Sequence, residues 1–254
     1  MPEISPRAVV EASASVADDV RIGPFAYIGP HVQLGPGCVI HAGATVAGRT
    51  TLGAKCQVFP QAVVGLSEEM DREGQCLAGQ GNCIREHATV YGGIEQPTVL
   101  GDDNLIMIGC RIGGGARLGN HCILSNFTQI DCLATVEDHV GTSAFTFVGP
   151  GAAVGAFSYV VGFTGIDTPA PPFAMVQGFP FRVRGVNSEK LRRCGFGDGD
   201  IQALRDAFRQ LFNDTGARVD DKVLGRLAGQ ADLNVHVRRL VETLRAQDGG
   251  RQRA

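Results

Sequence analysis

The chain has 254 residues, enough for one large domain or one domain with a small appendage. Its 23 Lys and Arg against 26 Asp and Glu give a net charge of -3, which excludes the bulk positive field that recruits nucleic acid or anionic lipid. The N-terminus lacks the features of a secretory signal, and no stretch approaches the roughly 20 apolar residues of a membrane span. We therefore expect a cytoplasmic protein.

Aliphatic residues recur at every sixth position along most of the chain, in three runs. The first run consists of Val10, Val16, Ile22, Ile28, Leu34, Ile40, Val46, Leu52, Val58 and Val64. The second is short and consists of Ala78, Ile84 and Val90. The third consists of Leu100, Ile106, Ile112, Leu118, Leu124, Ile130, Val136, Thr142, Val148, Val154, Val160 and Ile166.

A period of six matches neither an α-helix, with a period of 3.6, nor an ordinary strand, with a period of 2. It is typical of a chain wound into flat coils, in which each repeat supplies one short strand, one turn and one inward aliphatic side chain. We predict a parallel β-helix over residues 1–186. Thr142 is the one polar residue of the third run, and we expect a backbone carbonyl of an adjacent coil to accept its hydroxyl, because an unpaired buried hydroxyl costs about 1–3 kcal/mol.

Two segments interrupt the aliphatic periodicity. Residues 66–76 and 92–98 are rich in charge, glycine or proline, so we expect them to bulge outward as loops. The eight cysteines include no C-x-x-C pair, and their spacing does not offer the close ligand pairs of a zinc site. We expect reduced thiols packed as small apolar groups, with no metal and no cofactor.

The periodicity changes after Ile166. Residues 167–172 are proline-rich and form a stiff exit segment. Helical spacing follows at 201–212, with Asp198 and Asp200 as candidate N-terminal caps. We predict a second helix near 219–227, a third that begins at Asn234, and a frayed tail over 247–254. Residues 187–254 are therefore predicted to form a small α-helical domain.

Four segments resemble a known family, the UDP-N-acetylglucosamine acyltransferases of lipid A biosynthesis. They are Gly-Asp-Asp-Asn-Leu-Ile-Met-Ile at 101–108, Gly-Asn-His-Cys-Ile-Leu-Ser-Asn at 119–126, Ile-Arg-Glu at 84–86, and Gly-Val-Asn-Ser-Glu-Lys-Leu-Arg-Arg-Cys-Gly-Phe at 185–196. The resemblance implies a left-handed parallel β-helix of hexapeptide repeats. It also implies a homotrimer with active-site clefts between subunits, flanked by the two loops, and acyl transfer from acyl carrier protein to a UDP-sugar.

The residues that carry the family's chemistry are absent from the matching positions. By the family's pattern, Gly114 stands where a histidine acts as general base, and Gly115 stands where a carboxylate orients that histidine. Glycine has no titratable group, so the resemblance predicts that the standard base is missing. Other cleft positions of the family are occupied by Tyr91, Arg111, Cys132, Leu133, Gly149 and Pro150.

Two residues are candidates for a substitute base. His87 follows Arg85 and Glu86 near the loops, and Asp131 could act if burial raised its pKa. His121 and His139 follow polar turn residues and are expected to be solvated. A metal-dependent β-helix carbonic anhydrase is a further alternative, but His87 and His121 lie about two turns of the prism apart and have no close third partner.

The segment at 185–196 retains more of the residues that the resemblance assigns to sugar-nucleotide binding than the cleft positions retain of the catalytic ones. Asn187, Glu189 and Arg193 match those positions, and Arg192 replaces a basic neighbour. An arginine fork holds a pyrophosphate through charge-assisted hydrogen bonds. The alternative is structural, because Glu189 and Arg193 are four residues apart and form an i, i+4 ion pair on a helix.

Two functional hypotheses follow. The first is an acyltransferase-like pseudoenzyme that binds a sugar nucleotide or an acyl ligand at trimer interfaces, either as a homotrimer or together with an active paralogue. The second is an active acyltransferase that moves an acyl chain from acyl carrier protein to a UDP-sugar with a non-standard base. In either case we expect a closed trimer to bury the outward aromatic residues Phe127, Phe145 and Phe147.

Overall fold

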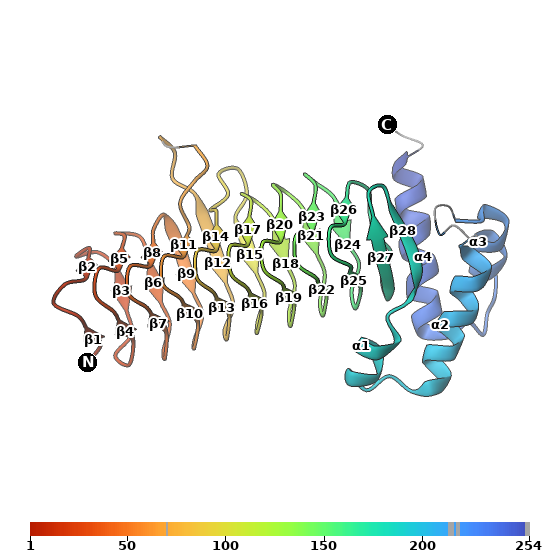
Figure 1. Ribbon diagram of the computed structural model, residues 1–254, viewed down its shortest axis with the longest axis horizontal. Coiled ribbons are helices and arrows are strands. Elements are labelled where there is room, and N and C mark those ends of the chain that lie inside the picture. Colours follow the sequence, from red (N-terminus) through yellow and green to blue (C-terminus); the bar gives the residue numbers. More distant parts are fainter. Residues whose placement is uncertain (70, 213–215, 217–218, 252–254) are drawn as a thin grey trace.

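The computed structural model describes residues 1–254 except 70, 213–215, 217–218 and 252–254. Three sheets, parallel except for the last strand of the first sheet, form an elongated prism, which is followed by helices at its C-terminal end (Figure 1). Away from the two loop-bearing coils and the last strands of the first sheet, the strands pair in register with residues 18 positions apart, as in Arg21 with Val39 and Tyr27 with Thr45. The mainly β solenoid predicted from the sequence is therefore confirmed.

The first sheet contains β1 (Glu3–Ile4), β4 (Arg21–Ile22), β7 (Val39–Ile40), β10 (Gln57–Val58), β13 (Cys83–Ile84), β16 (Leu105–Ile106), β19 (Ile123–Leu124), β22 (Gly141–Thr142), β25 (Tyr159–Val160), β27 (Ala174–Gly178) and β28 (Phe181–Val186). The second contains β2 (Val9–Val10), β5 (Tyr27–Ile28), β8 (Thr45–Val46), β11 (Val63–Val64), β14 (Thr89–Val90), β17 (Arg111–Ile112), β20 (Gln129–Ile130), β23 (Phe147–Val148) and β26 (Gly165–Ile166). The third contains β3 (Ser15–Val16), β6 (Gln33–Leu34), β9 (Arg49–Leu52), β12 (Gln75–Ala78), β15 (Thr98–Leu100), β18 (Arg117–Leu118), β21 (Thr135–Val136) and β24 (Ala153–Val154).

The aliphatic residues of the six-residue periodicity fill the interior of the prism. From Ile22 onward they are buried, whereas Val10 and Val16 are half-exposed because the first coil has no coil beneath it. Thr142 is also buried, as predicted. Its predicted partner is wrong: the hydroxyl accepts the backbone N–H of Ser125 at 3.0 Å and shares a hydrogen bond with the Thr128 hydroxyl at 2.8 Å.

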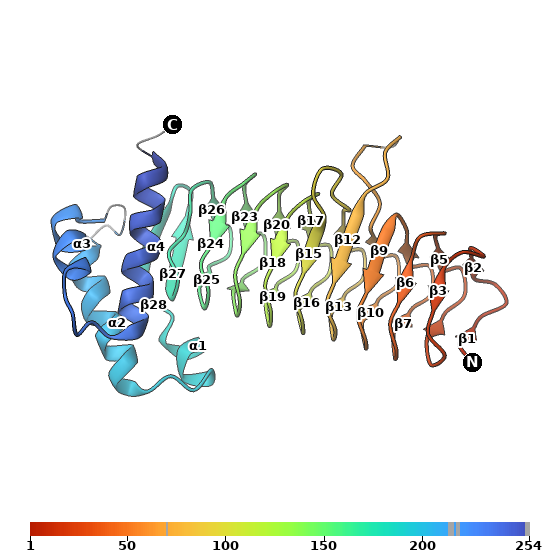
Figure 2. The ribbon, with the colours of Figure 1, turned by 180° about the vertical axis from the view of Figure 1, so that it is seen from behind.

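Both interruptions form loops that protrude from the same edge of the prism, where the second sheet turns into the third (Figure 2). The first loop ends at Gly74, earlier than predicted, because Gln75 and Cys76 already pair with the neighbouring coils in β12. The second runs between β14 and β15. The loops contact each other through the Leu66 carbonyl, which accepts the N–H of Gly92 at 2.8 Å.

The C-terminal part begins with an antiparallel hairpin, β27 and β28, and its described residues continue with four helices. They are α1 (Ser188–Arg193), α2 (Asp198–Leu211), α3 (Asp221–Ala228) and α4 (Val235–Arg251). Asn234 caps α4 through its Oδ1, which accepts the N–H of His236 at 2.9 Å, as predicted. Of these helices, none combines the length and the apolar content that crossing a bilayer requires, within the described residues.

Two expectations for this part are corrected. Neither Asp198 nor Asp200 caps α2, because the helix already begins at Asp198 and its N-cap is Gly197, which has no side chain to accept a hydrogen bond. The tail is not frayed from 247 onward, because α4 continues to Arg251, and residues 252–254 lie outside the described part of the chain. The cysteines behave as predicted: all eight are free, and most are buried.

Candidate functional site

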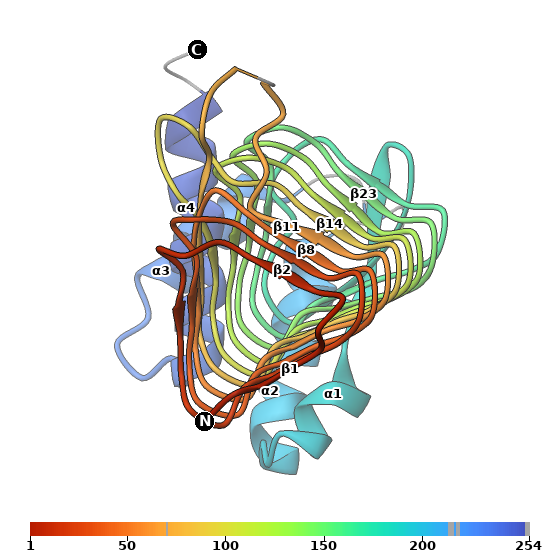
Figure 3. The ribbon, with the colours of Figure 1, turned by 90° about the vertical axis from the view of Figure 1, so that its left-hand side faces the viewer.

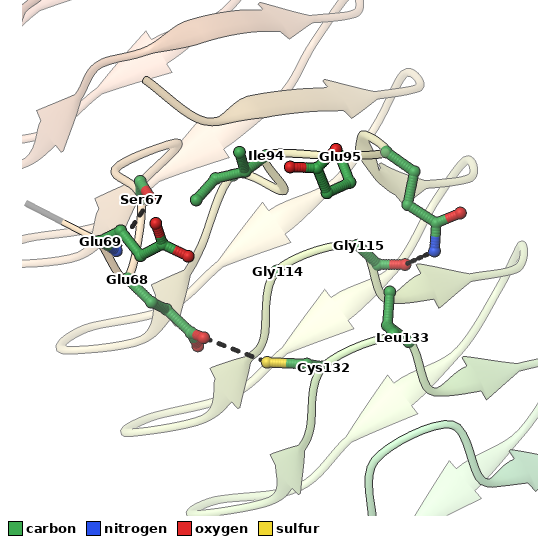
Figure 4. Close-up of a pocket in the computed structure, with 11 residues that line it drawn as sticks. Ser67, Glu68, Glu69, Ile94, Glu95, Gly114, Gly115, Cys132 and Leu133 are labelled. Atoms are coloured by element: carbon green, nitrogen blue, oxygen red, sulfur yellow. Dashed lines mark hydrogen bonds between the residues drawn. The ribbon is translucent and has the colours of Figure 1, made fainter. Parts of the chain in front are cut away.

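An open cleft lies between the two loops and the edge of the prism beneath them (Figure 4). Its volume is about 260 Å³. The turns that join the second sheet to the third supply the floor of the cleft, and the two loops supply its walls. The cleft is lined by Ser67, Glu68, Glu69, Gly92, Ile94, Glu95, Gln96, Gly114, Gly115, Cys132 and Leu133.

Gly114 at the floor leaves space where a side chain would fit, whereas a Cβ atom on Gly115 would lie 2.8 Å from Cδ2 of Leu133. A Cβ atom built on Gly114 would lie 3.4 Å from the carbonyl oxygen of Gly92, which is ordinary van der Waals contact. Gly115 has φ +73°, a left-handed conformation that glycine adopts without strain. Four positions singled out in the sequence, Gly114, Gly115, Cys132 and Leu133, therefore meet in one cleft, and none of its lining residues is a histidine.

A charged cluster stands beside these glycines. Arg111, on β17, places Nη2 2.5 Å from Oε1 of Glu68 and Nη1 3.5 Å from Oδ1 of Asp131. Its guanidinium lies over the ring of Tyr91, 5.3 Å from the centroid. The second oxygen of Glu68 accepts the thiol of Cys132 at 3.1 Å. All the titratable groups of the cluster are therefore engaged with one another.

The cluster determines the protonation of its members. Although partial burial acts to raise it, the pKa of Asp131 is held below its usual range by the N–H of Cys132 and the charge of Arg111. Burial and the neighbouring Glu68 raise the pKa of Cys132 to about 11, so its thiol is neutral at pH 7. The condition under which Asp131 was expected to act as a base, a raised pKa, is not met. A carboxylate with a low pKa is a weak base.

The backbone of Cys132 is also engaged. Its N–H donates to Oδ1 of Asp131 at 2.7 Å. This donor is therefore occupied by a carboxylate within the chain.

His87 lies at a different edge of the prism from the cleft. It stands in the turn between β13 and β14, where the first sheet meets the second, and its side chain is exposed. The cleft is built at the turn that follows the second sheet. The structure therefore does not bring this candidate base to the cleft.

His121 and His139 stand at the third edge of the prism. Their rings stack 4.9 Å apart, and His139 stacks in turn on Phe157. Both histidines are thus part of an aromatic stack, in which His121 is exposed, as expected, and His139 is half-buried. Among the described residues, no group of three or more His, Cys, Asp or Glu side chains is placed to hold a metal ion.

The sugar-nucleotide candidates cluster on and before α1. Asn187 is buried, and its amide donates to the carbonyl of Phe157 at 2.8 Å, which ties the helix to the prism. Glu189 and Arg193 form the i, i+4 pair at 2.9 Å with both side chains exposed. Arg192 places Nε 3.8 Å from Asp198. These contacts fit the structural alternative and leave the exposed guanidinium of Arg193 open to a ligand.

The cleft and the α1 segment lie on opposite sides of one chain. Viewed along the prism, the loops project from one corner and α1 lies beyond the opposite face (Figure 3). Both side views agree with this placement (Figures 1 and 2). The structure therefore does not bring the two groups of predicted residues together within one chain.

Sequence reasoning missed a second cavity, of about 610 Å³, between β28 and α2. Arg184, Arg205 and Arg209 line it around apolar residues that include Phe208. Arg184 lies on the strand β28, which was not predicted, whereas Arg205 and Arg209 lie on the helix α2. The sequence pattern therefore gave no sign that these arginines come together. Glu68 was missed for a similar reason, because it reaches Arg111 from a loop 43 residues away.

A hexapeptide β-helix with an open cleft at one edge defines the class of hexapeptide-repeat transferases. The family described as bacterial transferase hexapeptide (six repeats) matches residues 3–48 and 97–132. The family described as UDP N-acetylglucosamine O-acyltransferase, domain 2, matches residues 170–252. The coils are those of the left-handed β-helix that the sequence predicts.

Individual relatives narrow the class. The acyl-(acyl-carrier-protein)–UDP-N-acetylglucosamine O-acyltransferase of Stutzerimonas stutzeri is 36% identical over 219 residues, covering 84% of this chain and 85% of that protein. Its counterpart in Pseudomonas putida is 35% identical over 239 residues, covering 91% and 92%. The solved structure of LpxA from Acinetobacter baumannii superposes with a TM-score of 0.87 at 27% identity, over 96% of both chains. This chain belongs to the acyl-(acyl-carrier-protein)–UDP-N-acetylglucosamine O-acyltransferase family.

Proposed function

We propose that this chain is a catalytically impaired member of its family, which binds a sugar nucleotide or an acyl ligand at the interfaces of a trimer. The observation that carries the proposal is Gly114, which leaves the floor of the cleft without a titratable side chain at the position of the base. Loss of a general base typically lowers the rate of such a reaction by about 10²–10⁴-fold.

The remaining side chains of the cleft do not replace the base. Asp131 has a lowered pKa and holds both Arg111 and the N–H of Cys132. Cys132 is a neutral thiol at pH 7 and donates to Glu68.

Three carboxylates line the cleft and favour the alternative function, active acyl transfer with a non-standard base. Those of Glu69 and Glu95 pair with Arg72, and the third is that of Glu68. That carboxylate is already paired with Arg111.

A trimer is proposed because the cleft and the α1 segment lie on opposite sides of a single chain. A neighbouring copy is required to bring Arg193 of one chain to the cleft of another. Phe127, Phe145 and Phe163 also stack in a row along one edge, with 45%, 52% and 80% of their surfaces exposed. Phe147 is 40% exposed beside them. A closed ring of identical chains would bury such outward apolar residues.

We expect light scattering at micromolar concentration to give three times the 26.8 kDa of one chain. We expect this mass because the cleft and the α1 segment can meet only between copies of the chain, and because the exposed phenylalanine row would be buried there. The same measurement in the presence of an active relative tests whether mixed trimers form. A monomer mass would contradict the proposed interface site.

Binding of a UDP-sugar is expected to depend on Arg193. Its guanidinium is 74% exposed and, among the described residues, pairs with Glu189, which is 68% exposed, so it remains able to hold a phosphate. Calorimetry with UDP-N-acetylglucosamine should show binding that Arg193→Ala weakens by about 1.5–3 kcal/mol, the range for a hydrogen bond to a charged group. Arg245→Ala, an exposed arginine on α4, is the matched control and should bind as the wild type does. Equal binding by all three proteins would show that Arg193 has no role.

For acyl carrier protein, the supporting observation is the arginine-lined cavity between β28 and α2. An acidic protein would be attracted to Arg184, Arg205 and Arg209. The names of the relatives identify an acyl carrier protein as their acyl donor. We propose this surface as the place where such a partner approaches the chain.

A further inference from the structure

The loop between β11 and β12 places one of its own carboxylates against the floor of the cleft. Glu68 reaches across two neighbouring coils, with one oxygen on Arg111 at 2.5 Å and the other on the Cys132 thiol at 3.1 Å. Its side chain is only 32% exposed, although it belongs to a protruding loop. Both oxygens thus have a donor, as the oxygens of a bound anionic ligand would have.

We propose that Arg111 is the anchor for an anionic group of the cleft's ligand, a carboxylate or a phosphate, and that Glu68 is an internal occupant which this ligand displaces. The proposal deepens the function proposed above, because it names the chemistry that the cleft recognises. It assigns the loop carboxylate to a position that a ligand takes when it binds.

The guanidinium is held in place independently of Glu68. Asp131 contacts Nη1 at 3.5 Å and is itself fixed by the N–H of Cys132 at 2.7 Å. The ring of Tyr91 lies beneath the guanidinium, with the Arg111 Cζ atom 5.3 Å from the centroid. When Glu68 leaves, these contacts remain and Nη2 presents its N–H groups to the cleft. A positioned arginine with free donors is a suitable partner for carboxylate or phosphate oxygens.

Space for a larger ligand is left by the missing side chain of Gly114, where the nearest atom to a built Cβ is 3.4 Å away. Gly92, Gly114 and Gly115 line the same cleft, so a group bound to Arg111 has room to extend over the floor. The pairing of Arg111 with two carboxylates should also keep free anions out of the site at rest. An anion that approaches without displacing Glu68 meets two negative charges for one positive charge.

The occupant on the loop competes strongly with any free anion. A carboxylate tethered by a short segment has an effective concentration on the order of millimolar or higher at its partner. Small anions should therefore bind the wild type weakly, and removal of the tethered carboxylate should expose the site. The quantity to measure is therefore the difference in anion affinity between the wild type and a variant that lacks the Glu68 carboxylate.

The experiment compares Glu68→Ala with Glu95→Ala, using acetate and inorganic phosphate as probes at constant ionic strength. Glu95 is the matched control, because it lines the same cleft but pairs with Arg72 at 2.7 Å rather than with Arg111. We expect at least one probe to bind Glu68→Ala about tenfold more tightly than it binds the wild type or Glu95→Ala. Calorimetry and the rise in the unfolding temperature with anion concentration measure this.

Cys132 gives a second readout that localises the anion. Without Glu68 its thiol loses an acceptor and a negative neighbour, so iodoacetamide should alkylate it faster in Glu68→Ala. The bound probe should slow this reaction again, and peptide mapping separates Cys132 from the other seven cysteines. In the double variant Glu68→Ala/Arg111→Gln both the tighter binding and the protection should disappear. If that variant does not fold, protection of Cys132 in Glu68→Ala still decides the matter.

The two probes distinguish the source of the anion. Preference for acetate identifies a carboxylate-bearing ligand, and preference for phosphate identifies a phosphorylated one; both support the proposal. Equal binding by Glu68→Ala and Glu95→Ala, or tight binding without protection of Cys132, would overturn it. Because the titration uses neither a UDP-sugar nor an acyl donor, its failure is separable from failure of the proposed function.

Discussion

Acyl transfer to UDP-N-acetylglucosamine is expected to rise by on the order of 10²-fold when Gly114 is replaced by histidine. A positioned general base contributes about 10²–10⁴-fold, and we expect the lower end because Gly115 supplies no carboxylate to orient the new ring. The substitution is sterically permitted, since a Cβ at Gly114 would be 3.4 Å from its nearest neighbour, the carbonyl oxygen of Gly92. The cleft of about 260 Å³ in front of it has room for the imidazole.

The matched control for this experiment is Gly114→Gln, which adds a side chain of similar size without a titratable group. Rates are compared by mass spectrometry of the O-acyl product, with the detection limit as the lower bound. Gly113 is unsuitable for the same purpose, because a Cβ there would lie 2.6 Å from the backbone nitrogen of Cys132. If Gly114→His is no faster than Gly114→Gln, the missing imidazole is not what limits the reaction.

Truncation of Ile130 to alanine is expected to lower the free energy of unfolding by about 2–5 kcal/mol. Ile130 is 1% exposed in the middle of the prism. It pairs in register with Ile112 below and Val148 above, so the truncation leaves a cavity that rigid neighbouring coils cannot fill. Denaturant unfolding, followed by the shift of its midpoint, measures the effect.

Ile123→Ala is the matched control for this experiment. Ile123 is the same residue type in a neighbouring strand, but it points outward and is 43% exposed. Surface substitutions usually change stability by about 0.5 kcal/mol or less, so its midpoint should barely move. A similar loss of stability in both variants would mean that the inward aliphatic side chains do not provide the main stabilisation of the prism.

The fold was predictable because its signal is local and repeated. Each inward residue, such as Ile22 or Ile112, is placed by its own hexapeptide, so the register can be followed without knowledge of distant contacts. The errors arise where long-range contacts decide. Thr142 points inward as predicted, but its partners come from the side chain of Thr128 and the backbone of Ser125. The early end of the first loop is likewise set by the pairing of Cys76 with neighbouring coils.

The candidate site was predictable only in its floor. The resemblance to a known family located Gly114 and Cys132, which follow the regular coils and therefore meet where the pattern places them. Glu68 lies in an irregular loop, and no periodicity indicates where its side chain points. Asp131 shows a further limit: the sequence suggested burial as a way to raise its pKa, whereas Arg111 and the N–H of Cys132 lower it. His87, close to the loops in sequence, lies at another edge of the prism.

The most direct test of impaired catalysis is an acyl-transfer assay on the wild-type protein. The purified chain is incubated with an acyl carrier protein thioester and UDP-N-acetylglucosamine, and O-acyl product is quantified by mass spectrometry beside an active member of the family. With Gly114 where the resemblance to the family places the base, Asp131 held by Arg111, and Glu68 engaged, we predict no product or a barely detectable amount. Turnover at a rate comparable to that of the active relative would contradict this account.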